Sequence, residues 1–285
     1  MKVVAADPLA VVDRPPEHRR TRSPDDRRKG FDVYGRLAHV DERANREPAI
    51  QGALPSVEWR CVSTSGGPWR LVVADLDGTL VTATTACVYL DGWIGHGPVI
   101  EDLERRCAGG EITDTQVAES YAPFYRDIAV ADASAVLAQI SSLDDIALGV
   151  SLLSGRGIDA VIATVSWSFA AQALADLWGF TRVRGADLEV DDATSLFTGR
   201  VSRHCEPEDK VTFVAEQCQR LGVGLDQVVA IGDGRSDLPL FHSVGFSVAI
   251  NASSEARAAA SATVDSQSFL DALTAVPGLL DQPTR

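Results

Sequence analysis

Asp75 and Asp77 stand one residue apart at the end of a strand-like run at 71–76. Because side chains alternate along a strand, the two carboxylates point to one side and Leu76 points to the other. In parallel α/β sheets, ligands collect beyond the carboxyl ends of such buried strands. One carboxylate can then serve as a nucleophile or metal ligand and the other as an acid or base. The alternative interpretation is an acidic turn at Asp77 and Gly78.

Three later segments place further polar groups at comparable positions. One strand-like run ends in Ser166, and another runs into Asp233 and Asp237. Lys210 lies between them in a helix-like stretch. A hydroxyl at a helix start can bind phosphate oxygens, and carboxylates bind hard cations such as Mg²⁺. Taken singly, each segment also has a structural interpretation, as a helix N-cap, a turn or a surface lysine.

The four segments, in this order, resemble the motifs of haloacid dehalogenase-like (HAD) hydrolases. The first reads Asp-Leu-Asp-Gly-Thr-Leu at 75–80, and the fourth reads Gly-Asp-Gly-Arg-Ser-Asp at 232–237. The resemblance spans roughly residues 69–265 and is strongest with the phosphoserine phosphatase-like branch. It implies a Rossmann-like α/β fold with a small helical cap inserted after the first motif.

The resemblance assigns the chemistry to three residues. Asp75 would be the nucleophile that forms an aspartyl-phosphate, and Asp77 would protonate the leaving alcohol and later deprotonate water. Phosphatases of the superfamily carry this second aspartate, whereas dehalogenases lack it. Lys210 would neutralise negative charge on Asp75 and on the phosphoryl group. The resemblance therefore implies a phosphatase.

The same resemblance implies a Mg²⁺ site and a set of phosphate-binding residues. The metal ligands would be Asp75, Asp233 and the backbone carbonyl of Asp77, with Asp237 holding either the water shell of the metal or the lysine. Mg²⁺ is the cofactor that this set implies. The residues expected to bind phosphate are Gly78, Thr79, Ser166, Trp167 and Ser236.

Departures from the phosphoserine phosphatase pattern concern the leaving group. Thr84 stands where those enzymes carry a glutamate for the amino group of the substrate. Tyr121 stands at the place of an arginine that binds the substrate carboxylate, and Arg126 is a candidate for a shifted equivalent. We therefore expect preserved phosphoryl chemistry with an altered leaving-group pocket. The substrate classes considered are sugar, cyclitol, polyol and amino-alcohol phosphates.

The order of elements predicts an α/β fold with a doubly wound, mostly parallel sheet. Helical patterns at 98–108, 113–127 and 131–154 follow the first motif. We call residues 84–146 the cap segment, because an insertion there would cover the site and select the substrate. The catalytic core is expected at 69–83 and 147–285. Strands are expected at 71–76, 158–165, 227–231 and 246–250, helices at 168–178 and 207–221, and a hairpin or strand pair at 195–205.

The charge is uneven along the chain of 285 residues, whose formal net charge is −14. Residues 1–67 hold 12 Lys and Arg against 10 Asp and Glu, and the remainder holds 14 against 30. An acidic folded part argues against nucleic-acid binding. Residues 1–68 have few apolar side chains in their arginine-rich part and are expected to form a disordered arm. A docking arm for an anionic partner is the alternative.

The five cysteines are scattered and form no Cys-x-x-Cys pair. This pattern predicts neither a disulfide framework nor a zinc site, and a reducing, cytoplasmic setting follows as the expectation. No apolar stretch approaches the ~20 residues of a membrane helix, so no membrane association is expected.

These observations predict a Mg²⁺-dependent phosphatase that hydrolyses a small-molecule phosphate ester through an aspartyl-phosphate. A phosphotransferase that uses the same intermediate is the nearest alternative. A catalytically idle scaffold that binds a partner through its N-terminal arm is the alternative from another class.

Overall fold

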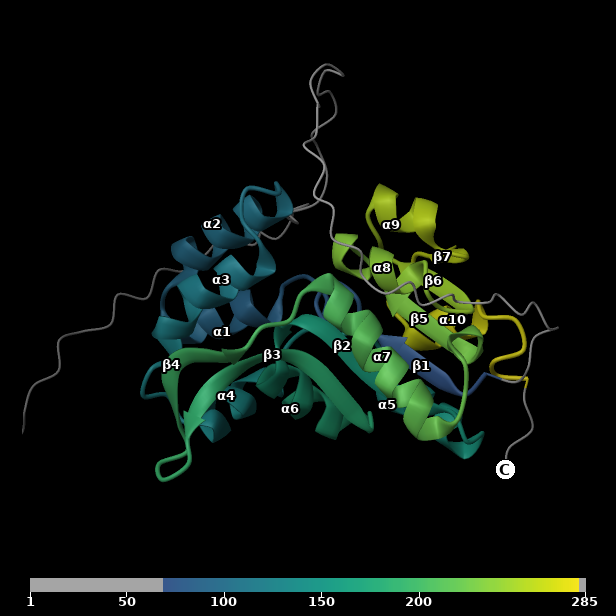
Figure 1. Ribbon diagram of the computed structural model, residues 1–285, viewed down its shortest axis with the longest axis horizontal. Coiled ribbons are helices and arrows are strands. Elements are labelled where there is room, and N and C mark those ends of the chain that lie inside the picture. Colours follow the sequence, from purple (N-terminus) through teal and green to yellow (C-terminus); the bar gives the residue numbers. More distant parts are fainter. Residues whose placement is uncertain (1–68, 282–285) are drawn as a thin grey trace, which may run out of the picture. The chain divides into compact units, whose positions relative to one another are not determined.

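A seven-stranded sheet forms the centre of the computed structural model, within the described residues 69–281 (Figure 1). The strand order is β4-β3-β2-β1-β5-β6-β7. All neighbouring strands are parallel except β3 and β4, which are antiparallel. The arm predicted at 1–68 lies outside the described residues. The strands are β1 (Leu71–Ala74), β2 (Asp159–Trp167), β3 (Arg182–Asp191), β4 (Leu196–Arg203), β5 (Val228–Gly232), β6 (Phe246–Ile250) and β7 (Ala262–Val264).

Helices connect these strands and cover both faces of the sheet. The α-helices are α1 (Ala86–Ile94), α2 (Gly97–Ala108), α3 (Asp114–Tyr121), α4 (Val130–Leu137), α5 (Ile146–Gly155), α6 (Ser168–Trp178), α7 (Pro207–Leu221), α8 (Leu238–Phe241), α9 (Ser254–Ala259) and α10 (Phe269–Thr274). Short 3-10 turns are η2 (Ala122–Tyr125), η3 (Leu225–Gln227) and η4 (Arg235–Asp237). No helix within residues 69–281 is long and apolar enough to cross a membrane.

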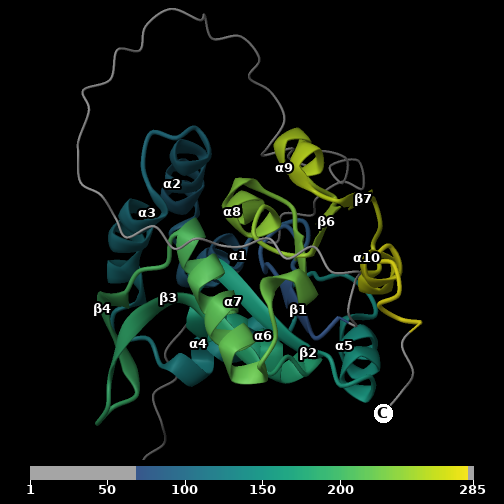
Figure 2. The ribbon, with the colours of Figure 1, turned by 45° about the vertical axis from the view of Figure 1, so that its right-hand side comes forward.

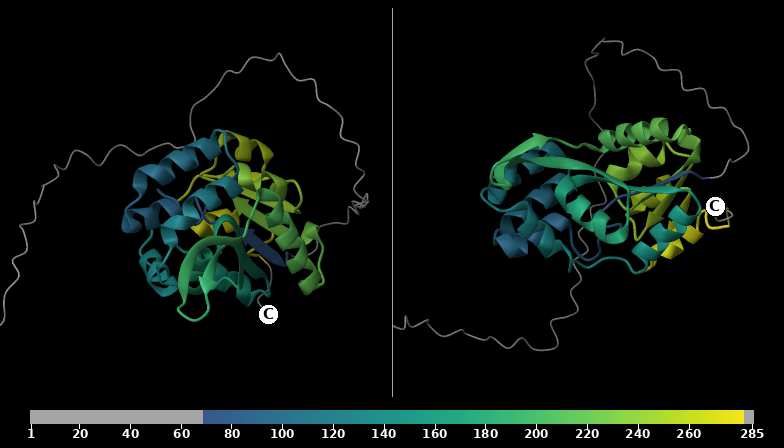
Figure 3. Two further views of the ribbon diagram at one scale, coloured as in Figure 1. Left: turned by 60° about the vertical axis from the view of Figure 1, so that its left-hand side comes forward. Right: turned by 90° about the horizontal axis from the view of Figure 1, so that it is seen from below.

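Strand β1 is buried on both faces, which explains its unbroken apolar sequence. Val72 and Ala74 pack in the hydrophobic cluster that includes α5, α6 and α10. Leu71 and Val73 pack in a second cluster that includes α7, α8 and α9. Figure 3, right, shows α7 and α10 on opposite sides of the sheet. The sheet is therefore doubly wound, and the predicted α/β fold is confirmed.

Several predicted elements need correction. The helical pattern at 131–154 is two helices, α4 and α5. Between them the backbone of Ser141 and Leu143 is hydrogen-bonded to residues 80–82, and Asp145 has a left-handed φ of 63° just before α5. The segment at 195–205 is a single strand, β4, and its hairpin partner is β3. The turn between them lies at Asp191, whose Oδ1 accepts the backbone N–H groups of Ala193 and Thr194. Strands β3 and β7 and helices α1, α9 and α10 were not predicted.

The cap segment forms helices α1 to α4. The chain enters and leaves this segment at neighbouring points beside the sheet. Thr82 N–H donates to the Ser141 carbonyl at 2.9 Å, and Leu143 N–H donates to the Leu80 carbonyl at 2.9 Å. The β3–β4 hairpin lies beside these helices (Figure 2), where Phe197 N–H donates to the Ile128 carbonyl at 2.9 Å. The exact division into cap and core stays a prediction.

Candidate active site

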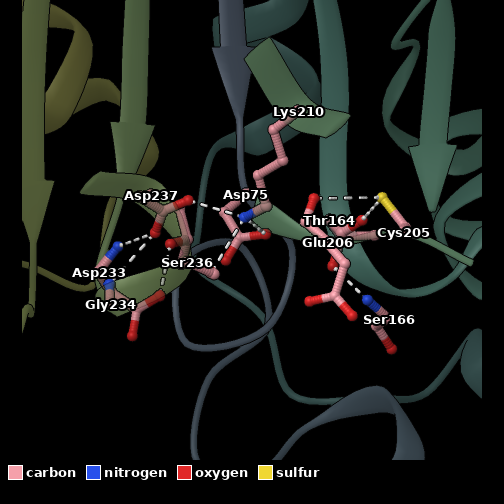
Figure 4. A network of polar contacts seen from close by, with 11 residues as sticks. Asp75, Thr164, Ser166, Cys205, Glu206, Lys210, Asp233, Gly234, Ser236 and Asp237 are labelled. Carbon is pink, nitrogen blue, oxygen red and sulfur yellow. Dashed lines mark hydrogen bonds and ion pairs between the residues drawn. The ribbon is translucent and has the colours of Figure 1, made fainter. Parts of the chain in front are cut away.

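A buried lysine joins two carboxylates at the carboxyl end of β1. Lys210 extends from the first turn of α7, and its Nζ lies 2.9 Å from Asp75 Oδ1 and 2.8 Å from Asp237 Oδ1 (Figure 4). Nζ also donates to Ser236 Oγ at 3.1 Å. Burial would lower the pKa of Lys210, but the charges of Asp237 and Asp75 outweigh burial and raise it. The amine is therefore positively charged at neutral pH.

The carboxylate of Asp75 is almost fully buried in this cluster. Asp75 follows β1 and is 5% exposed, and its backbone N–H donates to the Ile231 carbonyl of β5 at 2.9 Å. Burial, followed by the negative charge of Asp237, raises the pKa of Asp75, and Lys210 opposes the rise. A cation beside Asp75 would favour the ionised form that a nucleophile needs.

Asp75, Asp233 and Asp237 form a buried group that could hold a metal ion, because one oxygen of each lies within 4.8 Å of the others. Thr79 Oγ1 donates to Asp233 Oδ1 at 2.9 Å, and burial raises the pKa of Asp233 well above its ordinary value. Asp237 Oδ2 accepts the backbone N–H of Asp233 at 3.0 Å and of Gly234 at 3.2 Å. Both oxygens of Asp237 therefore have protein partners, and the set is one of hard oxygen donors that suits Mg²⁺.

Gly78 allows the close approach of the first motif to Asp233. Its φ is +81°, and a Cβ added there would lie 2.6 Å from the Asp233 carboxyl carbon. Gly110 has a similar φ of +72° with nothing within 4 Å of an added Cβ. Both glycines have a left-handed backbone, but only at Gly78 would an added methyl group contact another residue. Alanine variants at the two positions therefore differ in the cost of that contact.

We expect Gly78→Ala to destabilise the protein by at least about 1 kcal/mol more than Gly110→Ala, because only the first inserts a methyl group against Asp233. Chemical denaturation of the two variants beside the parent protein measures this difference. Equal losses would show that Asp233 moves aside without cost.

Asp77 lies two residues after Asp75, and its side chain contacts the start of α1. Its Oδ1 accepts the backbone N–H of Ala86 at 2.6 Å. Burial raises the pKa of Asp77 to about 6, and hydrogen bonds from Ala86 and with the Ser166 side chain oppose the rise. A carboxyl group with a pKa near neutrality can both donate and accept a proton.

Ser166 and Trp167 end β2 on the other side of β1. The Ser166 N–H donates to Thr164 Oγ1 at 3.1 Å, and Ser166 Oγ lies 3.5 Å from Cys87 Sγ. Trp167, not Ser166, is the N-cap of α6. The alternative interpretation of Ser166 as an N-cap is therefore wrong.

These groups line one cavity of about 170 Å³. The core contributes Asp75, Asp77, Ser166, Trp167, Asp233 and Ser236. The cap segment contributes Thr85, Cys87, Glu104, Cys107, Asp114 and Tyr121. Asp75, Asp77 and Asp233 thus face one cavity, and Lys210, which does not line it, contacts Asp75.

Comparison with known protein families supports this arrangement. The sequence profile of the family described as haloacid dehalogenase-like hydrolase matches residues 72–242, which include all four predicted motifs. The chain belongs to the haloacid dehalogenase-like hydrolase family. This match confirms the predicted family and places the chain among enzymes.

HAD-family relatives with curated names share about a quarter of their aligned residues with this chain. Phosphoserine phosphatase from Archaeoglobus fulgidus is 26% identical over 216 residues, which cover 75% of this chain and 61% of the relative. Phosphoserine phosphatase from Polaromonas sp. is 26% identical over 196 residues, which cover 66% of this chain and 82% of the relative. The chain thus spans less than two thirds of the first relative.

The HAD fold is also found in solved structures. A phospho-aspartyl intermediate analogue of phosphoserine phosphatase superposes with a TM-score of 0.63 at 18% identity, covering 73% of this chain and 99% of that chain. At this identity the likeness concerns the fold alone. It agrees with the order of strands described above.

The structure brings most predicted HAD site residues together, with two differences. Gly78 and Thr79 lie against Asp233 and do not line the cavity, and their phosphate-binding role stays a prediction. Arg126 is exposed, lies against Gly199 and does not line the cavity either. The suggested shifted arginine therefore has no place in this site.

Several cavity residues were not predicted, above all Thr85, Glu104, Asp114 and Arg235. Thr85 had a detectable signal, because it precedes an apolar run as a helix N-cap, and its Oγ1 accepts the Val88 N–H at 3.1 Å. Glu104 and Asp114 lie on different helices, and only tertiary packing brings them to the cavity.

Proposed function

We propose that the protein is a Mg²⁺-dependent phosphatase that hydrolyses a small-metabolite phosphomonoester through an aspartyl-phosphate on Asp75. The observation that carries the proposal is the position of Asp75. It is ion-paired with Lys210, grouped with Asp233 and Asp237, and shares a cavity with Asp77. The curated relatives, which are named phosphoserine phosphatases, support the reaction type.

In the first half of the reaction, an oxygen of Asp75 attacks phosphorus and the bond from phosphorus to the ester oxygen breaks. The ester oxygen takes a proton from Asp77 and leaves as a neutral alcohol. The charge of Lys210, 2.9 Å from Asp75, offsets the repulsion between the carboxylate and the phosphoryl oxygens. Ser166, which lines the cavity, supplies a hydroxyl donor to one of those oxygens.

In the second half, Asp77 is a carboxylate and takes a proton from water. The water oxygen attacks phosphorus, the bond from phosphorus to Asp75 breaks, and inorganic phosphate forms. Asp77 ends protonated again, so the two halves return each group to its starting state. A pKa near 6 suits both directions of this transfer.

Mg²⁺ fits the group formed by Asp75, Asp233 and Asp237, because all three offer buried carboxylate oxygens and Gly78 leaves room at Asp233. The backbone carbonyl of Asp77 is the further ligand that we propose. The ion would supply positive charge that draws electron density from the phosphoryl oxygens. Asp237 would position Lys210 through a hydrogen bond to its Oδ1 and the backbone of residues 233–234 through hydrogen bonds to its Oδ2.

The test is phosphate release from a panel of phosphorylated metabolites and one aryl phosphate, with Mg²⁺ and then with EDTA. We expect release that requires the metal. Release that EDTA does not affect would reject the metal assignment. No release from any compound would reject the phosphatase assignment and favour the scaffold alternative. Adding alcohols and analysing the products separates hydrolysis from phosphoryl transfer.

We expect turnover to survive removal of residues 1–67, because every residue of the proposed site lies within residues 69–281. The measurement is kcat/KM of the truncated and the full chain on the same substrate, with circular dichroism to show that the truncation is folded. A folded truncation without turnover would mean that residues 1–67 take part in catalysis.

A further inference from the structure

A carboxylate on the cap side of the cavity is not used by the chemistry above. Glu104 lies on α2 and lines the same cavity as Asp75 and Asp77. Its Oε1 accepts the Thr85 hydroxyl at 2.7 Å, and no described residue donates to its Oε2. It forms no ion pair with any residue in the described part of the chain. Glu104 thus leaves carboxylate charge available to the molecule that fills the cavity.

Glu104 and Asp77, the proposed proton donor, are both held at the start of α1. Thr85 binds Glu104 through its hydroxyl, and the next residue, Ala86, binds Asp77 through its backbone N–H at 2.6 Å. The two carboxylates are therefore fixed by consecutive residues at the start of α1. If Asp77 protonates the leaving oxygen, Glu104 faces the first few atoms of the leaving group.

Positive charge is scarce on this side of the cavity. Arg235 is the one arginine, lysine or histidine among the described residues that line it, and its side chain is exposed. Burial raises the pKa of Asp114, and Arg235 is among the groups that oppose the rise, so Asp114 has a cation nearby. The uncharged Tyr121 donates its hydroxyl to the Cys87 carbonyl at 3.1 Å. Of the two cap-segment carboxylates that line the cavity, Asp114 and Glu104, Glu104 is therefore the one without a nearby cation among the described residues.

We infer that the leaving group carries a protonated amine, so that the substrate is the phosphate monoester of a small amino alcohol, and that Glu104 selects it. The inference rests on the phosphatase activity proposed above. An ammonium group supplies the cation that Glu104 lacks, and a charge pair is stronger in a partly buried site than in water. A leaving group with a carboxylate meets repulsion from Glu104. Burial raises the pKa of Glu104 to about 7, and a bound cation returns it to the ionised form.

The test uses three substrates of matched size that differ at one end: 2-aminoethyl phosphate, 2-hydroxyethyl phosphate and carboxymethyl phosphate. An aryl phosphate serves as the common reference. With the full chain and Mg²⁺, kcat/KM is expected to be roughly 10- to 100-fold higher for the amine than for the alcohol, and lowest for the carboxylate.

The variant Glu104→Gln removes the charge and keeps the shape. We expect the amine-to-alcohol ratio of kcat/KM to fall by roughly 10-fold or more. The ratio is measured within one preparation, so a smaller folded fraction does not change it. Glu101→Gln is the matched control, because Glu101 is an exposed glutamate on the same helix. Its ratio is expected to equal that of the parent protein.

The outcomes separate the two proposals. If the aryl phosphate is hydrolysed but the alcohol or carboxylate substrate equals or exceeds the amine, the inference is wrong and the phosphatase assignment stands. An amine preference that survives Glu104→Gln, or is lost equally in Glu101→Gln, also overturns the role of Glu104. If none of the four compounds is hydrolysed, both proposals fail.

Discussion

Replacing Asp75 by asparagine is expected to lower turnover by roughly 10⁴-fold or more, because a neutral amide cannot attack phosphorus. The side chain keeps its size, so the fold is expected to persist. Burial and the charge of Asp237 already make the ionised form of Asp75 unfavourable, and Lys210 opposes this only in part. The neutral amide therefore removes little net stabilisation. The measurement is kcat on the best substrate of the panel, together with the midpoint of thermal unfolding.

A matched control for this prediction is Asp176→Asn, which makes the same chemical change at an exposed position on α6. Its turnover and its unfolding midpoint are expected to match those of the parent protein. Turnover of Asp75→Asn at the parental rate would rule out Asp75 as the nucleophile. A large fall in the unfolding midpoint would instead mean that the Asp75 charge stabilises the fold.

Replacing Lys210 by methionine is expected to affect both activity and stability. Lys210 is 0% exposed and lies within 2.9 Å of the Asp75 and Asp237 carboxylates, so its removal leaves buried negative charges without their cation. Loss of one partner of a buried ion pair costs about 3–5 kcal/mol of unfolding free energy. Loss of a charge that offsets phosphoryl repulsion is expected to lower kcat by roughly 10²- to 10³-fold. Chemical denaturation and steady-state kinetics measure the two effects.

Ser236→Ala is the comparison for Lys210, because Ser236 is the neutral partner of Nζ at 3.1 Å. Its loss is expected to cost about 1.5 kcal/mol, since one hydrogen bond to a charged group contributes less than a buried charge with two carboxylate partners. Full turnover in a destabilised but folded Lys210→Met variant would show that the lysine has only a structural role. Added Mg²⁺ is expected to stabilise Lys210→Met more than the parent protein, because the ion would neutralise the same carboxylates.

The sheet was predictable where strands are buried on both faces. Strands β1, β2, β5 and β6 are mostly apolar, and each was expected within a few residues of its observed bounds. Strand β3 was not, because it is only partly buried and charged residues interrupt it. A hairpin or strand pair was expected at 195–205, yet Gly199 lies within the single strand β4 with a φ of +77°.

The site was predictable to the extent that its residues stand at strand ends. Asp75, Ser166 and Asp233 stand at the carboxyl ends of the parallel neighbours β1, β2 and β5, so one edge of the sheet brings them together. Lys210 depended on the resemblance, because a helical lysine carries no signal of burial. Glu104 had no signal, since its place at the cavity depends on how α2 packs beside α1. Local sequence motifs thus predict the residues expected to bind phosphate, but they do not predict the residues expected to contact the leaving group.

The most direct test of the account is chemical trapping of the proposed intermediate. The full chain is mixed with Mg²⁺ and substrate, then treated with borohydride, which reduces an aspartyl-phosphate to homoserine. Peptide mass spectrometry locates the reduced residue. We predict homoserine at position 75, with none in Asp75→Asn and none without substrate. Substrate hydrolysis with an unmodified Asp75, or with homoserine at another aspartate, would contradict the account.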